Sequence, residues 1–190
     1  MKPELRAKLV DFSGVRGAGP EAIQAVESAL GIDLPADYVD LIGTINGGEG
    51  LVGNQYLMLW RIDDLLSFNK EYEVEQYAPG LLLFGSNGGG EAYAFDLRSD
   101  SQQVVNVPFI GMDLKHIIVV AQTFLSFIDG LSAQTRKSGA RRFLGKEIIE
   151  IKPIILGGSP TDLSNKVALD RRQHIEAVRY WNRIVRELAK

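Results

Sequence analysis

The chain has 190 residues, of which 45% are hydrophobic and 24% charged, and it contains no cysteine. This composition suffices for one sizeable core with a small appendage, and the lack of cysteine excludes disulfides, thiolate metal sites and a cysteine nucleophile. Charged residues are scattered through residues 1–14, and no segment is apolar over the length that a bilayer requires. We therefore expect a soluble, cytoplasmic protein.

Charge is divided unevenly along the chain. Residues 1–135 hold 18 acidic and 8 basic side chains, a net charge of −10, whereas residues 136–190 hold 6 acidic and 13 basic ones, a net charge of +7. Two interpretations are open. Either the acidic part attracts a basic partner such as a nucleic-acid-cutting toxin, or the basic part packs on the acidic part of the same chain.

Two helices are predicted near the start of the chain. Residues 20–30 repeat apolar side chains at helical spacing and are followed by a glycine, which predicts a helix. Residues 35–45 begin with proline and end before Asn46, the first residue of an Asn-Gly pair that can adopt left-handed backbone angles. This pattern predicts a second helix. Its Asp37 and Asp40 are expected to face solvent.

A strand and a third helix are predicted next. Residues 57–60 form a short apolar run that predicts a buried strand, with Trp60 in the core. A helix is then expected from Asp63 or Asp64 to Tyr77, because a carboxylate suits the first position and a Pro-Gly pair ends the segment. The exposed side of this helix is acidic.

A glycine-rich hairpin follows. Residues 81–85 and 91–96 predict two strands, and residues 86–90 predict the turn between them, because only glycine-like residues turn the chain so tightly. Residues 104–110 predict a third strand, antiparallel to its neighbour. Residues 117–131 carry a regular helical pattern and are expected to close the core as a helix.

These motifs resemble those of the SUKH superfamily, the Smi/Knr type of protein. In that family a helix of the form Leu-Pro-x-x-Tyr leads into Asn-Gly, and a Phe-Gly-x-x-Gly-Gly hairpin follows. The resemblance covers residues 20–131. The matching positions, all of them structural, are Pro35, Tyr38, Asn46, Gly47, Gly48, Gly85, Gly88, Gly89 and Gly90.

The resemblance implies a single α+β domain over residues 1–135, in which a mostly antiparallel sheet packs with helices. It also implies a protein-binding role, since bacterial members usually act as immunity proteins that bind and occlude a secreted polymorphic toxin. No motif residue is catalytic, and neither a cofactor nor a metal is expected. Because binding residues concentrate on loops, the candidate partner contacts are Glu49, Asn54, Gln55, Tyr56, Asn87, Glu91 and Tyr93.

Residues 136–190 predict a basic extension that packs on this domain. It consists of a linker over residues 133–142, a strand over residues 147–155, a loop over residues 157–162 and a helix from about Asp170. The expected buried stripe of the helix is Ile175, Val178, Trp181, Val185 and Leu188. A basic ridge on another side consists of Arg179, Arg183, Arg186 and Lys190.

The extension also resembles an HNH nuclease module in the order of its Lys-Pro, Gly-Gly, Asn165 and His174 elements. Ile149 and Glu150 occupy the places where metal-binding histidines would stand, so the resemblance is to a catalytically degenerate skeleton. His174 is expected to pack or hydrogen-bond against the loop over residues 157–164.

Other functions fit the sequence less well. The glycines of residues 85–90 are not expected to bind phosphate, because a strand and not a helix follows them. The basic ridge suits a solvated helix face better than a nucleic-acid surface, because few aromatic residues interleave it. An adaptor of the same fold without a toxin partner is the nearer alternative. A small hydrolase is the remote one, and its candidate groups are Glu49, Glu91, Asp96, Asp113 and His116.

Overall fold

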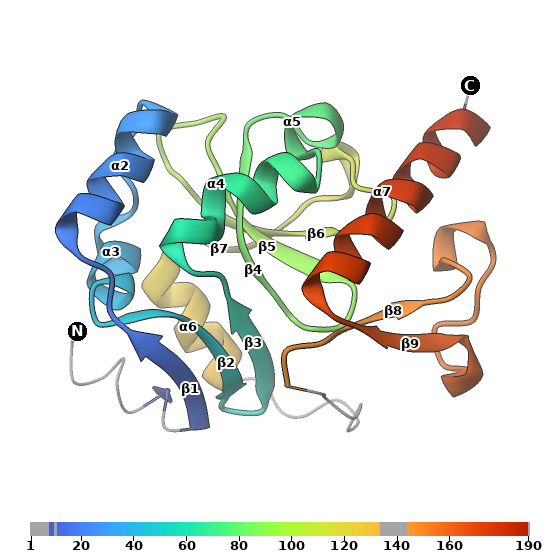
Figure 1. Cartoon of the computed structure of the whole chain (residues 1–190), viewed down its shortest axis with the longest axis horizontal. Coiled ribbons are helices and arrows are strands. Elements are labelled where there is room, and N and C mark those ends of the chain that lie inside the picture. The colour runs from blue at the N-terminus through green and yellow to red at the C-terminus, as the bar shows by residue number, and fades with distance from the viewer. Residues whose placement is uncertain (1–7, 10, 134–143, 190) are drawn as a thin grey trace.

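The computed structural model describes residues 8–9, 11–133 and 144–189. Its centre is a seven-stranded sheet in which the order of the strands in space is their order in the chain (Figure 1). Each strand is antiparallel to its neighbours. The strands are β1 (Asp11–Arg16), β2 (Ile45–Val52), β3 (Gln55–Leu59), β4 (Leu81–Ser86), β5 (Glu91–Asp96), β6 (Val104–Pro108) and β7 (Ile118–Ala121).

Helices cover both faces of this sheet (Figure 1). On one face α4 (Ile62–Glu71) and α5 (Val74–Tyr77) pack on β4, and α2 (Pro20–Leu30) packs against α4. On the other face α3 (Ala36–Ile42) packs against α6 (Phe124–Ala133). This arrangement confirms the predicted α+β fold. Among the described residues, no helix is long and apolar enough to cross a membrane.

Aromatic clusters fill the core on each side of the sheet. On the α3 and α6 side, Tyr38 is fully buried. Its ring lies between 5.1 and 5.8 Å, centroid to centroid, from those of Phe84, Phe95 and Phe124. On the α4 side, the Trp60 ring stacks on Tyr72 and meets the edge of Phe68. The prediction of Trp60 as a core residue is therefore confirmed.

Several predicted elements are confirmed in place. The first helix has the predicted bounds, residues 20–30, and the apolar run of residues 57–60 lies largely in β3. The segments of residues 81–85, 91–96 and 104–110 form three adjacent antiparallel strands. Local apolar patterning and turn glycines were sufficient to place these elements.

The second predicted helix is shorter than expected. α3 begins after Pro35, but it ends before β2, so the prediction of a helix to residue 45 stopped by Asn-Gly is wrong. Gly47 and Gly48 do have positive φ angles, of 78° and 136°, but they lie inside the strand. A Cβ on Gly47 would lie 2.9 Å from Arg61, and one on Gly48 would lie 2.3 Å from the Ser13 carbonyl oxygen. These glycines therefore permit close approach of neighbouring segments.

The helix predicted from residue 63 or 64 to Tyr77 is interrupted. α4 and α5 are separated at Glu73, whose φ is +56°. Neither Asp63 nor Asp64 caps the start of α4. The Ile62 N–H instead donates to the side-chain oxygen of Asn46 at 2.8 Å. The cap therefore comes from β2, a contact that local sequence does not reveal.

The helical pattern of residues 117–131 spans two elements. Residues 117–120 are all β-branched, and three of them lie in strand β7, which pairs with β6. Only the second half of the segment is therefore helical. The Leu125 N–H in the first turn of α6 donates to Asp37 Oδ2 at 2.6 Å. Asp37 is consequently half-buried, and the expectation that it faces solvent is wrong.

The extension forms a second, smaller unit of structure. β8 (Glu147–Glu150) and β9 (Lys166–Leu169) pair as an antiparallel two-stranded sheet, and α7 (Arg171–Leu188) follows. The strand predicted to residue 155 is shorter than expected, because a proline opens a 3-10 turn after β8. A reciprocal capping box between Asp170 and Gln173 starts α7 where the sequence predicts it. The linker predicted over residues 133–142 lies almost wholly outside the described residues.

The buried face of α7 differs from the predicted stripe. Ile175 and Val178 are buried, but Leu188 is 70% exposed. Two polar side chains that the predicted stripe does not include, those of His174 and Asn182, are buried instead. A hydrophobicity pattern does not identify them, because their burial depends on hydrogen-bond partners elsewhere in the chain.

The cap that Asn46 provides generates a stability prediction. Asn46→Ala leaves the buried Ile62 N–H without its acceptor, and we expect a loss of about 1–3 kcal/mol in the free energy of unfolding, measured in urea. Asn54→Ala at the exposed turn between β2 and β3 is the control and should change stability by less than about 0.5 kcal/mol. Equal effects of the two substitutions would contradict this role of Asn46.

Candidate functional site

A buried ion pair joins the extension to the sheet. Arg171 Nη1, at the start of α7, donates to Glu147 Oε1 of β8 at 2.8 Å. Ser86 Oγ, at the end of β4, donates to the same oxygen at 2.6 Å. Glu147 is only 1% exposed, so this carboxylate is held by one partner from the extension and one from the sheet.

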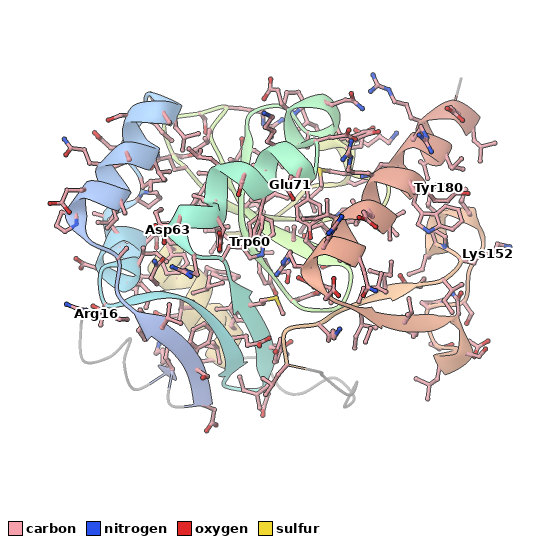
Figure 2. All side chains as sticks on the ribbon, viewed as in Figure 1. Arg16, Trp60, Asp63, Glu71, Lys152 and Tyr180 are labelled. Atoms are coloured by element: carbon pink, nitrogen blue, oxygen red, sulfur yellow. The ribbon has the colours of Figure 1, made fainter. Side chains whose placement is uncertain are left out.

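Aromatic side chains enclose the guanidinium of Arg171. Its Cζ lies 5.2 Å from the centre of the Trp60 ring and 5.4 Å from that of Phe68, which is a cation–π arrangement. Trp60 is labelled beneath α4 in Figure 2. Nη1 also donates to Tyr72 Oη at 3.2 Å. Because a guanidinium only donates, the Tyr72 oxygen accepts here, and the same oxygen is hydrogen-bonded to Nδ1 of His174, 2.6 Å away.

His174 is a neutral, fully buried side chain. Burial, and secondarily the charge of Arg171, lowers the pKa of His174 from 6.5 to about 3. Its ring meets those of Tyr72 and Phe109 edge-on. The expectation that His174 contacts the loop over residues 157–164 is therefore wrong, because α7 turns this side chain toward the sheet. Burial likewise raises the pKa of Tyr72 above its ordinary value of 10.

Asn182, two turns further along α7, fixes the segment that follows β6. Its Nδ2 donates to the Phe109 carbonyl at 2.9 Å, and its Oδ1 accepts from the Gly111 N–H at 2.6 Å. The side chain thus takes the place of a neighbouring strand for this segment. Together with the cluster around Arg171, it ties α7 to the sheet at two separate points.

The residues of the glycine hairpin also have structural roles. A Cβ on Gly85 would lie 2.4 Å from the Met58 carbonyl oxygen, so only glycine allows β3 and β4 to approach here. Asn87 Oδ1 accepts from the N–H groups of Gly89 and Glu91, which closes the turn. Gly88 and Gly90, the remaining two glycines of the turn, have positive φ angles.

The seven candidate partner contacts lie at one end of the sheet but on both of its faces. The β2–β3 and β4–β5 turns share that end, because β2 and β4 run in the same direction. Opposed residues point to the same face, and the register pairs Glu49 with Met58, Met58 with Ser86, and Ser86 with Ala92. Glu49 therefore lies on the same face as Ser86, whose side chain bonds to Glu147 of the extension. Glu91 and Tyr93, on either side of Ala92, point to the other face.

These candidates differ in how much surface they offer. Glu49 accepts from Tyr56 Oη at 2.5 Å and from the Gly145 N–H of the extension at 2.7 Å. Tyr93 is 8% exposed and packs on α6. The more accessible candidates are Asn54, which is exposed, and Gln55, Asn87 and Glu91, which are half-buried. Their partner-binding role stays a prediction.

A cavity of about 440 Å³ lies where the extension meets the sheet, and we call it the seam cavity. The turn between β4 and β5 and the segment after β6 form one side of it, and β8 with the 3-10 turn that follows forms the other. The polar residues at its border are Glu91, His116 and Glu150, and the rest of the lining is mostly apolar.

The seam cavity brings together two groups of the hydrolase alternative, Glu91 and His116, and no others. Glu49 has the partners given above, while Asp96 and Asp113 form ion pairs with Arg98 and Lys115. No serine, threonine or lysine lines the cavity among the described residues. A search of the same residues finds no group of three or more side chains arranged to hold a metal ion.

The charges of the two parts remain largely separate. Among the described residues, only the Arg179–Glu73 ion pair, at 3.2 Å, joins the extension to the preceding part of the chain. α2, α4 and α5 together hold six acidic residues and one lysine, among them Asp63 and Glu71 on α4 (Figure 2). α7 holds five arginines and two glutamates. The helical layer therefore has an acidic half and a basic half.

Sequence reasoning missed the cluster around Arg171, although one signal was present. Cations are unfavourable in the first turn of a helix, yet α7 begins with two arginines. An arginine at that position indicates a specific partner. The identity of the partner, Glu147, depends on how β8 and α7 lie together, which no local pattern encodes.

The comparison with protein families gives one finding. The model of the SMI1 / KNR4 family (SUKH-1) matches residues 17–130, which is more than half of the chain. The chain therefore belongs to the SMI1/KNR4 family (SUKH-1), as the sequence motifs indicate. The comparison with curated proteins finds no match. The extension lies beyond the matched range, so its likeness to an HNH module stays a prediction.

The buried ion pair generates a prediction about stability. Glu147→Gln leaves the Arg171 guanidinium buried without a counterion, and we expect a loss of about 3–5 kcal/mol in the free energy of unfolding. The control is Glu176→Gln, which removes the same charge from the exposed Arg172–Glu176 pair and should cost less than about 1 kcal/mol. Similar losses in both variants would show that burial of the pair is unimportant.

The neutral His174 generates a prediction about pH. The unfolded chain takes up a proton near pH 6.5, whereas folded His174 does so only near pH 3, so stability is lost as pH falls between these values. From pH 7 to pH 5 we expect a loss of about 2 kcal/mol in the free energy of unfolding. The carboxyls whose pKa the fold lowers, in Asp96, Asp113 and Asp162, titrate below this window.

Variants of the two histidines of the chain test this assignment by urea unfolding at both pH values. His174→Gln should remove most of the loss, and His116→Gln, which leaves the buried ring in place, should retain it. An undiminished loss in His174→Gln would contradict the assignment.

Proposed function

We propose that this member of the SMI1/KNR4 family is a non-enzymatic binding protein that neutralises a secreted bacterial toxin by covering its active surface. Family membership carries the proposal, since the motifs of residues 35–48 and 85–90 resemble those of immunity proteins of this fold. In the structure these motif residues cap a helix, close a turn and permit close approach of strands. They build a scaffold, and so the function resides in the surface that the scaffold presents.

The charge of the helical layer supports a basic partner. α2, α4 and α5 carry six acidic residues against one lysine, and one ion pair with the extension offsets only Glu73, which lies between α4 and α5. Such a field accelerates encounter with a positively charged protein. A nuclease domain, which must attract nucleic acid, is a partner of that kind.

The contacts that fix the complex would come from the hairpin ends. Tight complexes depend on a few buried anchors within a polar rim. Asn54 and Gln55 at the β2–β3 turn and Asn87 and Glu91 at the β4–β5 turn are the candidates with accessible surface. They share one end of the sheet, so one partner surface can reach both turns.

Co-expression with the toxin-like product of an adjacent gene tests the proposal directly. We expect rescue of growth and co-purification of a one-to-one complex. A folded protein that neither rescues growth nor binds the neighbouring product would contradict toxin neutralisation and favour the adaptor role.

The acidic helices generate a kinetic prediction for the purified complex. Glu71→Gln with Glu75→Gln should lower the association rate constant several-fold at low ionic strength, and the difference should vanish at high salt, because solvent screens exposed charges. The dissociation rate constant should hardly change. Glu187→Gln on the basic helix α7 is the matched control, and an equal effect there, measured by stopped flow, would contradict steering by the acidic helices.

A further inference from the structure

The two halves of the helical layer lie next to each other on one broad side of the molecule. α2, α4 and α5 form the acidic half and α7 forms the basic half, and Figure 1 shows them from left to right across the sheet. The halves meet at the ion pair between Glu73 and Arg179. The sign of the surface charge therefore reverses across this boundary.

Most charges of the layer lack a partner within the chain. Among the described residues, only Asp63 of the six carboxylates in the acidic half forms an ion pair, with Arg61. On α7, Arg183 and Arg186 form no ion pair with any described residue. Both halves consequently present charge that an oppositely charged surface can neutralise.

The basic half also has the composition of a protein interface. Arg183 Cζ lies 5.9 Å from the centre of the Tyr180 ring, and Arg186 Cζ lies 5.7 Å from that of Tyr77. These cation–π contacts hold both guanidinium groups at the surface. Tyr180, labelled on α7 in Figure 2, is 49% exposed. Arginine and tyrosine are the residue types that contribute most often to the centre of protein interfaces.

The boundary between the halves is hollowed. A cavity of about 330 Å³ is lined by Gln76 and Tyr77 from α5 and by Tyr180 and Arg183 from α7, among others. A hollow of this size admits a large side chain from a facing surface. Leu66 on α4 is 36% exposed, so apolar surface accompanies the charges in the acidic half as well.

A surface divided in this way is complementary to a second copy of itself in one orientation. Homo-oligomers most often form through a two-fold axis, which brings the same surface of two copies together. An axis that runs along the boundary places the acidic half of each copy over the basic half of the other. An axis that crosses the boundary within the interface places each half over its like, which is repulsive. Charge therefore selects the first arrangement.

From these observations we infer that two copies of the chain associate through their helical layers, with α4 and α5 of each copy against α7 of the other. This inference goes beyond the proposed function, because it requires no toxin. Exposed ion pairs contribute little each, so we expect a reversible dimer with a Kd of about 10 µM. At sub-micromolar concentration the chain is then monomeric, and its acidic helices are open to a basic partner.

Sedimentation equilibrium of the full chain tests the dimer. At about 100 µM and low ionic strength, the mass should approach twice the 20.9 kDa of one chain. A tenfold increase in salt concentration should raise the Kd at least about tenfold, because ions screen exposed charges. A single-chain mass at low ionic strength, or an association that salt does not weaken, would overturn the inference.

Charge exchange identifies the surfaces that meet. Glu71→Arg with Glu75→Arg reverses the acidic side of the boundary, and Arg183→Glu with Arg186→Glu reverses the basic side. Each double variant alone should be monomeric at the same concentration, because like charges then face each other across the axis. An equal mixture of the two variants should regain the dimer mass, because every contact again joins opposite charges.

The control reverses two exposed carboxylates outside the helical layer. Asp40→Lys with Asp100→Lys makes the same change in net charge as the acidic-side variant and should leave the association unchanged. Circular dichroism verifies the fold of each variant before mixing. Equal weakening by this control, undiminished association of either reversed variant alone, or a mixture of folded variants that stays monomeric would each overturn the inference.

Discussion

The burial of the Arg171 guanidinium is the constraint on which the arrangement of the molecule depends. A cation removed from water requires a counterion and partners for its remaining donors. Arg171 obtains them from β8 through Glu147, from the end of α4 through Tyr72, and from the ring of Trp60. These elements lie far apart in the sequence, so a single side chain fixes α7 and β8 against the sheet.

This constraint links the extension to the proposed binding surface. Ser86 donates to the carboxylate that holds Arg171, and it lies directly before the glycine turn that forms one wall of the seam cavity. The opposite wall belongs to β8 and the turn after it. The fold of the SMI1/KNR4 family supplies the hairpin, and the extension converts the end of that hairpin into a cavity. A rigid scaffold that presents a shaped site of this kind is suited to binding another protein.

The sequence predicted those elements whose pattern is local and failed where the outcome depends on a distant partner. The helix of residues 20–30 and the β4–β5 hairpin follow from apolar spacing and turn glycines. The helix predicted to residue 45 failed because the Asn-Gly pair occupies a strand, where Asn46 caps a helix that begins 16 residues later. The side chain of Asn69, like that of Asn46, bonds to the backbone of a distant segment. It bonds to both the N–H and the carbonyl of Leu83, each at 2.8 Å, in place of a neighbouring strand. The candidate contacts could be assigned to hairpin ends, but their division between two faces required the register.

The central claim is that the extension and the sheet form one cooperative unit around the buried cluster. Native-state hydrogen exchange measures this most directly, through amides that bridge the two parts, those of Ile148 and Gly111, compared with the amide of Leu83 inside β4. The account predicts the same free energy of opening at all three positions, because α7 and β8 separate from the sheet only when the whole structure unfolds. Exchange of the bridging amides at a much lower free energy, with Leu83 still protected, would show that the extension detaches by itself and would contradict the account.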